Sequence, residues 1–235
     1  MHESLPTLAD IEAARSRISA LARLTPVLRD EALDDEIGAR LFFKCENLQR
    51  VGAFKFRGAC NAVFALDDAT AARGVVTHSS GNHGAALAMA AALRGIAAHI
   101  VVPENANALK LRNIVEAGAT VHRCAPTLAA REAMCAAIQR EFGAELVHPY
   151  ADVRVMAGQG TAALELLDQV NGLDAFVAPV GGGGLMSGCA IALRARSPHT
   201  VLIGAEPAGA DDAQRSLAAG HVVPVERPNS ICDGL

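Results

Sequence analysis

From residue 75 onward, short apolar runs alternate with longer stretches of helical periodicity, and this alternation limits the fold of the chain more than any other feature. Strands are predicted over residues 75–77, 98–102, 120–123, 145–147, 174–180 and 201–205. Helices are predicted over residues 84–94, through 109–115, up to 142, over 156–170 and over 185–196. Strands that alternate with helices of this length form a parallel sheet covered on both faces, so the sequence predicts an α/β fold. Residues 174–180 read as a nearly continuous apolar run, which is typical of a buried parallel strand.

The first part of the chain carries two helix signals and one strand signal. Thr7 with Asp10 resembles a capping box, and the apolar residues that follow keep helical spacing until Pro26. Residues 41–45 read as a strand. The residues after Lys55 again keep helical spacing, so Lys55 is predicted to lie at or just before the start of a helix.

Lys55 is placed unusually for a lysine, because it stands between Phe54 and Phe56. Burial disfavours the charged ammonium, and the guanidinium of Arg57 is expected to push the same way, so we expect a lowered pKa. A free amine is the group that forms a Schiff base with a carbonyl cofactor. The alternative is a buried stem whose amine reaches water. The only other lysines are Lys44 and Lys110.

Composition excludes several classes of function. The chain has 235 residues, of which 51% are hydrophobic, so it can bury a substantial core in one large or two small domains. Its net charge of -4, single tyrosine and lack of a basic run argue against nucleic-acid binding. No signal peptide or membrane span is expected. The six cysteines have no regular spacing, which predicts reduced core thiols and a cytoplasmic protein.

The four glycines 181–184 come directly after an apolar strand and directly before a helix. Such a turn can point several N–H groups into one concavity beside the positive end of the helix dipole, which favours a phosphate site. A nicotinamide-binding interpretation competes. Gly182, Gly184 and Gly188 resemble a loose dinucleotide fingerprint, and Glu206 ends the next strand. However, the spacing is not G-x-G-x-x-G, and this interpretation gives Lys55 no role.

Two further stretches are candidates for ligand binding. Residues 78–83, His-Ser-Ser-Gly-Asn-His, form a second strand-to-helix turn whose polar side chains could line a site. A plain N-cap at Ser79 or Ser80 is the simpler interpretation. The acidic residues Glu206, Asp211 and Asp212 could hold Mg²⁺ or Ca²⁺, or could form an ordinary acidic loop.

The stretch from Lys44 to Ala59, with Lys-Cys-Glu-Asn-Leu-Gln and Gly-Ala-Phe-Lys-Phe-Arg-Gly-Ala, closely resembles the cofactor-lysine motif of the fold-type II pyridoxal-phosphate enzymes. Within that group it is similar to the serine/threonine dehydratases and serine racemase. Further motifs resemble the family in order at residues 79–83, 148–150, 157–161, 181–184 and 204–207. The resemblance implies a tryptophan synthase beta-like fold with two open parallel-sheet domains. The large domain would comprise residues 1–72 and 152–235 and lack its C-terminal part, and the small domain would comprise residues 73–151.

The resemblance also implies roles for individual residues. Lys55 would form the Schiff base with pyridoxal 5'-phosphate, Phe54 would back the pyridine ring, and Asn82 would bind the cofactor's 3-hydroxyl. Ser80 matches the acid/base that acts on the second face in the racemase. The phosphate would be held by Gly181, Gly182, Gly183, Gly184 and Leu185. A divalent-cation site, for Mg²⁺ or Ca²⁺, is matched by Glu206, Ala210 and Asp212.

The function that the resemblance implies is a lyase that converts L-threonine or L-serine to 2-oxobutyrate or pyruvate plus ammonia. Serine racemase is the alternative, because both reactions begin by removing the Cα proton. A truncated, non-catalytic relative is a third interpretation, and a nicotinamide-binding oxidoreductase is a fourth. The expected partners are a small amino-acid substrate and further copies of the chain, in a homodimer or higher oligomer.

The sequence departs from the family pattern at two places. Residues 51–53 are Val-Gly-Ala where the family usually has Thr-Gly-Ser, which predicts a more apolar pocket. The family also continues past residue 235 with further strands and helices, including a Ser or Thr that meets the pyridine nitrogen. A fragment, a chain completed by a partner and an incompetent enzyme are the three interpretations of this second departure.

Overall fold

The computed structural model describes residues 5–225 and 229–232 and, at positions 109 and 110, the backbone alone. Residues 233–235, where the sequence departs from the family pattern, lie outside this range. A four-stranded parallel sheet is built from β3 (Val75–His78), β4 (Ala98–Pro103), β5 (Thr120–Cys124) and β6 (Glu145–Leu146), in the order β5-β4-β3-β6. The predicted α/β architecture is therefore confirmed.

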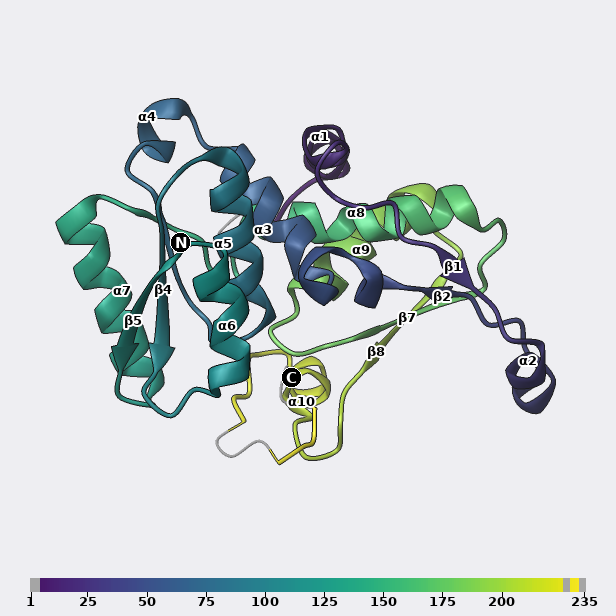
Figure 1. Cartoon of the computed structure of the whole chain (residues 1–235). Helices are drawn as coiled ribbons and strands as arrows, with labels where there is room; N and C mark the ends of the chain where they lie inside the picture. Colours follow the sequence, from purple (N-terminus) through teal and green to yellow (C-terminus); the bar gives the residue numbers. More distant parts are fainter. Residues whose placement is uncertain (1–4, 226–228, 233–235) are drawn as a thin grey trace.

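Helices cover both faces of this sheet, as Figure 1 shows. The helix α7 (Leu128–Phe142) packs on one face, and α5 (Asn82–Arg94) and α6 (Ala108–Glu116) lie on the other. The strand β3 is buried along its whole length, because it has a neighbour on each side and helices above and below. The alanine-rich face of α5 lets this helix pack closely against β4 and α3 (Lys55–Phe64).

The second layer is organised around α8 (Val153–Gln169), which packs between α3 and α9 (Gly184–Arg196). Glycines make both contacts close. A Cβ atom added to Gly158 would lie 2.6 Å from the Cα atom of Gly58 in α3, and one added to Gly188 in α9 would lie 2.1 Å from the carbonyl oxygen of Met156. The helix α1 (Leu8–Ile18) covers α8, and its predicted capping box between Thr7 and Asp10 is present.

The second parallel pair, β7 (Ala175–Pro179) and β8 (Val201–Ala205), corrects one prediction. The strand β7 was predicted to be buried on both faces, but Val177 is 60% exposed, as are Val201 (57%) and Ile203 (44%) on its neighbour. The reason is that these two strands form a sheet of their own within the described residues, with α8 and α9 against one face only.

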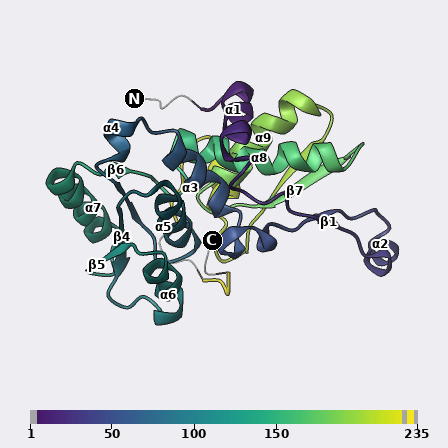
Figure 2. The ribbon, with the colours of Figure 1, turned by 45° about the horizontal axis from the view of Figure 1, so that its top comes forward.

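Several short elements had not been predicted. An arm formed by β1 (Val27–Leu28) and β2 (Phe43–Lys44) carries α2 (Glu31–Ile37) at its end, well away from the rest of the molecule (Figure 2). The remaining elements are the 3-10 helices η1 (Glu46–Leu48) and η2 (Arg50–Gly52) and the helices α4 (Asp68–Ala71) and α10 (Asp212–Ala219). The strand predicted over residues 41–45 is shorter than expected.

The remaining structural predictions have mixed outcomes. Five of the six cysteines are buried and all six are unpaired, as predicted, but Cys232 is exposed. None of the helices in the described residues is long and apolar enough to cross a membrane. The division into residues 1–72 with 152–235 and residues 73–151 stays a prediction.

Candidate active site

Lys55 is the first residue of α3, as the helical spacing had predicted. Its Nζ atom donates a hydrogen bond of 3.0 Å to the carbonyl oxygen of Pro149 and lies 5.3 Å from the centre of the Phe54 ring. Burial disfavours the charged ammonium and lowers the pKa of Lys55 to about 8. A substantial fraction of free amine is therefore present near neutral pH.

The expected contribution of Arg57 to this shift is wrong. The Arg57 side chain is fully buried on the other side of the helix start, where it pairs with Glu46 at 2.7 Å and Glu165 at 2.7 Å. Its charge is compensated there, and burial alone accounts for the lowered pKa of Lys55. The Nζ atom of Lys44 also donates to Glu165, at 2.8 Å, so Lys44 has a structural role.

The backbone just before Lys55 is strained. Val51 has φ 56°, in the left-handed region that a β-branched residue rarely adopts. It stands where the family usually has Thr, and the buried Ala53 stands where the family has Ser. Such strain is typical of functional segments that the surrounding structure holds in place.

The start of α5 brings a second group of candidate residues to the site. Gly81 is the N-cap of this helix and no side chain caps it, so the interpretation of Ser79 or Ser80 as a plain N-cap is wrong. The hydroxyl of Ser79 instead accepts from the N–H of Gly81 at 3.3 Å, and Ser80 is half-buried. Asn82, predicted to bind the cofactor, is the first residue of α5 and is exposed.

The four glycines 181–184 form the turn from β7 into α9. Gly183 is the N-cap with φ 80°, a conformation that favours glycine. The N–H groups of Gly183, Gly184 and Leu185 form no hydrogen bond with any described residue, so they are free to bind an anion. A Cβ atom on Gly182 would lie 2.2 Å from Cγ of Tyr150, so the aromatic ring packs directly on this turn.

Residues 147–150, here called the strap, connect these parts. The N–H of Val147 donates to Val76 in the sheet, Pro149 accepts from Lys55, and the Tyr150 ring covers Gly182. The strap also contacts the buried His83, whose Nε2 atom lies 3.2 Å from the carbonyl oxygen of Val147. Sequence reasoning had given no role to His83 or to the strap, although both belong to stretches that resemble the family.

The acidic loop after β8 has a structural role in this structure. The Glu206 carboxylate accepts from the N–H groups of Ala213 (3.0 Å) and Gln214 (2.8 Å), so it caps the first turn of α10. Ala210 is buried and Asp212 begins the helix. Within the described ranges, no group of three or more His, Cys, Asp or Glu residues is arranged to hold a metal ion.

The nicotinamide interpretation loses its two supports. Gly188 is explained by the close contact of α9 with α8, because a side chain there would collide with the carbonyl oxygen of Met156. Glu206, the residue that would bind a ribose, is occupied by the start of α10.

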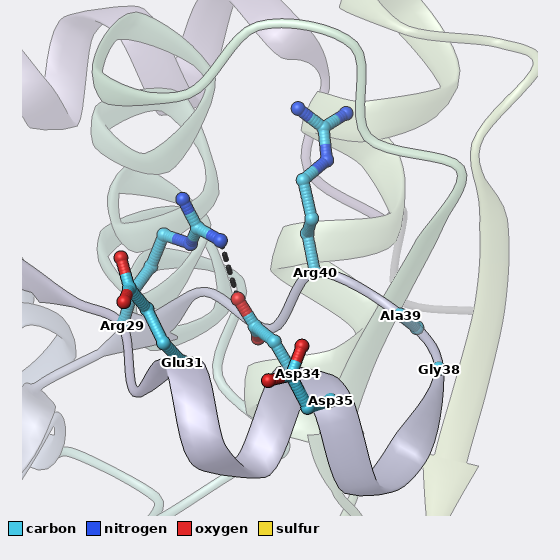
Figure 3. Close-up of a pocket in the computed structure, with 7 residues that line it drawn as sticks. All are labelled: Arg29, Glu31, Asp34, Asp35, Gly38, Ala39 and Arg40. Atoms are coloured by element: carbon cyan, nitrogen blue, oxygen red, sulfur yellow. Dashed lines mark hydrogen bonds and ion pairs between the residues drawn. The ribbon is translucent and has the colours of Figure 1, made fainter.

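A hollow of about 680 Å³ lies on the arm rather than at Lys55 (Figure 3). It is open and lined by Arg29, Glu31, Asp34, Asp35, Gly38, Ala39 and Arg40, and Arg29 forms an ion pair with Asp34 inside it. It contains no free amine and no glycine turn. We therefore place the chemistry at Lys55.

The residues at Lys55 fit pyridoxal phosphate. An amine with a lowered pKa can bond to its aldehyde, and the unpaired N–H groups at the start of α9 can bind its phosphate. A side chain on Gly182 or Gly184 would collide with Tyr150, so both positions must stay bare.

Comparisons with known proteins agree with this fit. A family model described as "Pyridoxal-phosphate dependent enzyme" matches residues 18–235. The beta-hydroxyaspartate dehydratase of Paracoccus denitrificans is 50% identical over 98% of this chain and 73% of its own length. The structure of maize serine racemase has a TM-score of 0.97 and 46% identity, covering 99% of this chain and 70% of its own. For the structure of a threonine deaminase from T.th., the corresponding values are 0.92, 43%, 97% and 74%.

Proposed function

The chain belongs to the pyridoxal-phosphate-dependent enzyme family, and from this premise we propose that it removes the Cα proton of a β-hydroxy amino acid and racemises serine. The observation that carries the proposal is the half-buried amine of Lys55, with a pKa of about 8 and a hydrogen bond to Pro149. An amine of this kind can accept a proton near neutral pH. The likeness to maize serine racemase favours the racemase over the threonine or serine ammonia-lyase that the motifs alone had placed first.

In the proposed mechanism the protein's residues position the substrate and move its proton. The bound cofactor supplies an electron sink for the electron pair left at Cα. The Nζ atom of Lys55 takes the proton from one face, and Pro149 orients that nitrogen. Ser80, half-buried at the start of α5, returns a proton to the other face, which inverts the centre. When the β-hydroxyl leaves as water instead, the products are a 2-oxo acid and ammonia.

The cofactor contacts are proposed as follows. The N–H groups of the glycine turn and of Leu185 hold the phosphate, supported by their lack of other partners among the described residues. Phe54, which lies beside the Lys55 amine, backs the pyridine ring, and the exposed Asn82 binds the 3-hydroxyl.

A second candidate function is the dehydration of 3-hydroxyaspartate. The specific observation that favours it is the cation Arg131, whose charge lowers the pKa of His78 at the end of β3, next to the strap residue His148. A guanidinium near the site could bind the second carboxylate of that substrate. The dehydratase of Paracoccus denitrificans supports this candidate, since its name gives that class of substrate.

The experiment is a product assay on the purified chain with pyridoxal phosphate. L-serine should give D-serine, and Lys55→Ala should abolish it. The Ser80→Ala variant should lose about 100-fold or more of D-serine formation while pyruvate formation persists, because only inversion needs the second face. If 3-hydroxyaspartate is consumed instead, and Arg131→Met raises KM for it but not for serine, the second candidate holds. Inactivity towards both substrates in protein that has bound the cofactor rejects both candidates.

The remaining proposals concern assembly and cations. Glu206, the carbonyl of Ala210 and Asp212 would hold Mg²⁺ or Ca²⁺, for which Glu206 would have to share its oxygens with the start of α10. A homodimer or higher oligomer and a cytoplasmic location also remain predictions. Melting curves with and without each cation, and sedimentation of the purified chain, test the first two.

A further inference from the structure

His83 is the second residue of α5, and its side chain is almost fully buried at 2% exposure. Its Nε2 atom lies 3.2 Å from the carbonyl oxygen of Val147. A carbonyl oxygen can only accept, so Nε2 carries the proton and Nδ1 has a free lone pair. That Nδ1 atom is buried and has no hydrogen-bond partner among the described residues.

A buried acceptor without a partner destabilises the folded state, so the position needs a reason to be histidine. An apolar side chain of similar size would fill the space without that cost. The one interaction that an apolar residue could not replace is the bond from Nε2 to Val147. This bond fixes the first residue of the strap at the start of α5.

The strap in turn contacts both chemical groups of the site. Two residues beyond Val147, the carbonyl of Pro149 accepts from Nζ of Lys55. One residue further, the ring of Tyr150 packs on Gly182 in the glycine turn. A displacement of Val147 would therefore be passed to the amine and to the wall of the anion site together.

We propose that His83 is a positioning residue, whose neutral imidazole, protonated at Nε2, holds the strap so that Pro149 and Tyr150 set the places of the Lys55 amine and of the glycine turn. The inference rests on the proposed function only for its bearing on the reaction. The geometry can be tested without cofactor or substrate.

The test uses two substitutions that differ in one donor. In His83→Gln the side-chain amide reaches the place of Nε2 and can still donate to Val147. In His83→Asn the shorter amide cannot reach it. His99→Asn is the matched control, because His99 is also buried (7%) but contacts His122 and Phe142 rather than the strap.

The first readout is the titration of Lys55, followed by NMR in protein labelled at lysine Cε. Only three lysines are present, and Lys55→Ala assigns the signal. We expect the pKa to stay near 8 in the parent, in His83→Gln and in His99→Asn, and to rise toward the ordinary value of about 10.4 in His83→Asn as water reaches the amine. The second readout is amide exchange at Tyr150 and Ala151, expected to accelerate about tenfold in His83→Asn alone.

Two results would overturn the proposal. One is an equal effect, or no effect, of the Asn and Gln variants on Lys55 in folded protein. The other needs no substitution, and so covers the case in which a variant does not fold: ¹⁵N NMR of the parent showing the proton of His83 on Nδ1. Failure of the racemase assay with these readouts as expected would reject the proposed function and leave the role of His83 standing.

Discussion

The Nζ atom of Lys55 lies 3.0 Å from the carbonyl oxygen of Pro149, although ninety-four residues separate the two along the chain. Both the free amine and the ammonium can donate to a carbonyl, so this contact orients the nitrogen without choosing its protonation state. Burial makes that choice, because it disfavours the charge.

The lowered pKa of Lys55 predicts how reaction with an aldehyde depends on pH. Below a pH of about 8 the ammonium dominates and cannot attack, so the rate of Schiff-base formation with pyridoxal phosphate should rise with pH and level off above that value. Stopped-flow absorbance measures this rate, with Lys55→Ala as the blank. A midpoint near the ordinary lysine value of about 10.4 would show that the amine is hydrated.

Acid should destabilise the fold through His83. Burial, followed by the charge of Lys55, lowers its pKa to about 3, whereas the unfolded chain has the ordinary value of 6.5. Below pH 6.5 the unfolded state binds a proton that the folded state does not, so the free energy of unfolding should fall by up to about 1.4 kcal/mol per pH unit until the pH reaches about 3. Urea titrations at several pH values should show this slope reduced in His83→Gln and retained when the exposed His221 is replaced by Gln.

Removal of the buried guanidinium should cost more stability than removal of an exposed one. Arg57→Met leaves Glu46 and Glu165 without their main partner and should reduce the free energy of unfolding by about 3–5 kcal/mol. Arg15→Met, which breaks an exposed pair with Asp168, should cost about 1 kcal/mol or less. Denaturant unfolding measures both. Equal losses in the two variants would mean that the Arg57 pairs contribute no more than exposed ones.

A methyl group on the glycine turn should weaken cofactor binding. In Gly182→Ala the added carbon would lie 2.2 Å from Cγ of Tyr150, so the ring or the turn must move. We expect the affinity for pyridoxal phosphate to fall about tenfold, as when one or two hydrogen bonds are lost. Absorbance titration measures it, and the double variant with Tyr150→Ala should regain part of the loss. No recovery in the double variant would place the strain elsewhere.

Sequence reasoning found the parts of this site that have a local signature. The helix start at Lys55, the capping box at Thr7 and the glycine turn each follow from neighbouring residues. The partner of Arg57 could not be found this way, because Glu165 is 108 residues away and only packing brings the two together. The role of His83 was hidden for the same reason, since its partner Val147 belongs to another element.

Local signals also existed that were not used. Asp30 caps α2 and Gly38 ends it in the left-handed conformation, so this short helix had both its start and its stop written in the sequence. The exposure of Val177 could not be anticipated from its own run, because an apolar strand reads the same whether one of its faces is covered or both.

The glycines of α8 have one more consequence. The reactive nitrogen starts one helix, the anion-binding turn starts another, and both helices press on α8 with no side chain between the backbones. A thermal tilt of that shared neighbour would carry both ends of the cofactor site in the same direction. The span between amine and phosphate would thus survive such a fluctuation, like the gap between two rungs fixed to one rail.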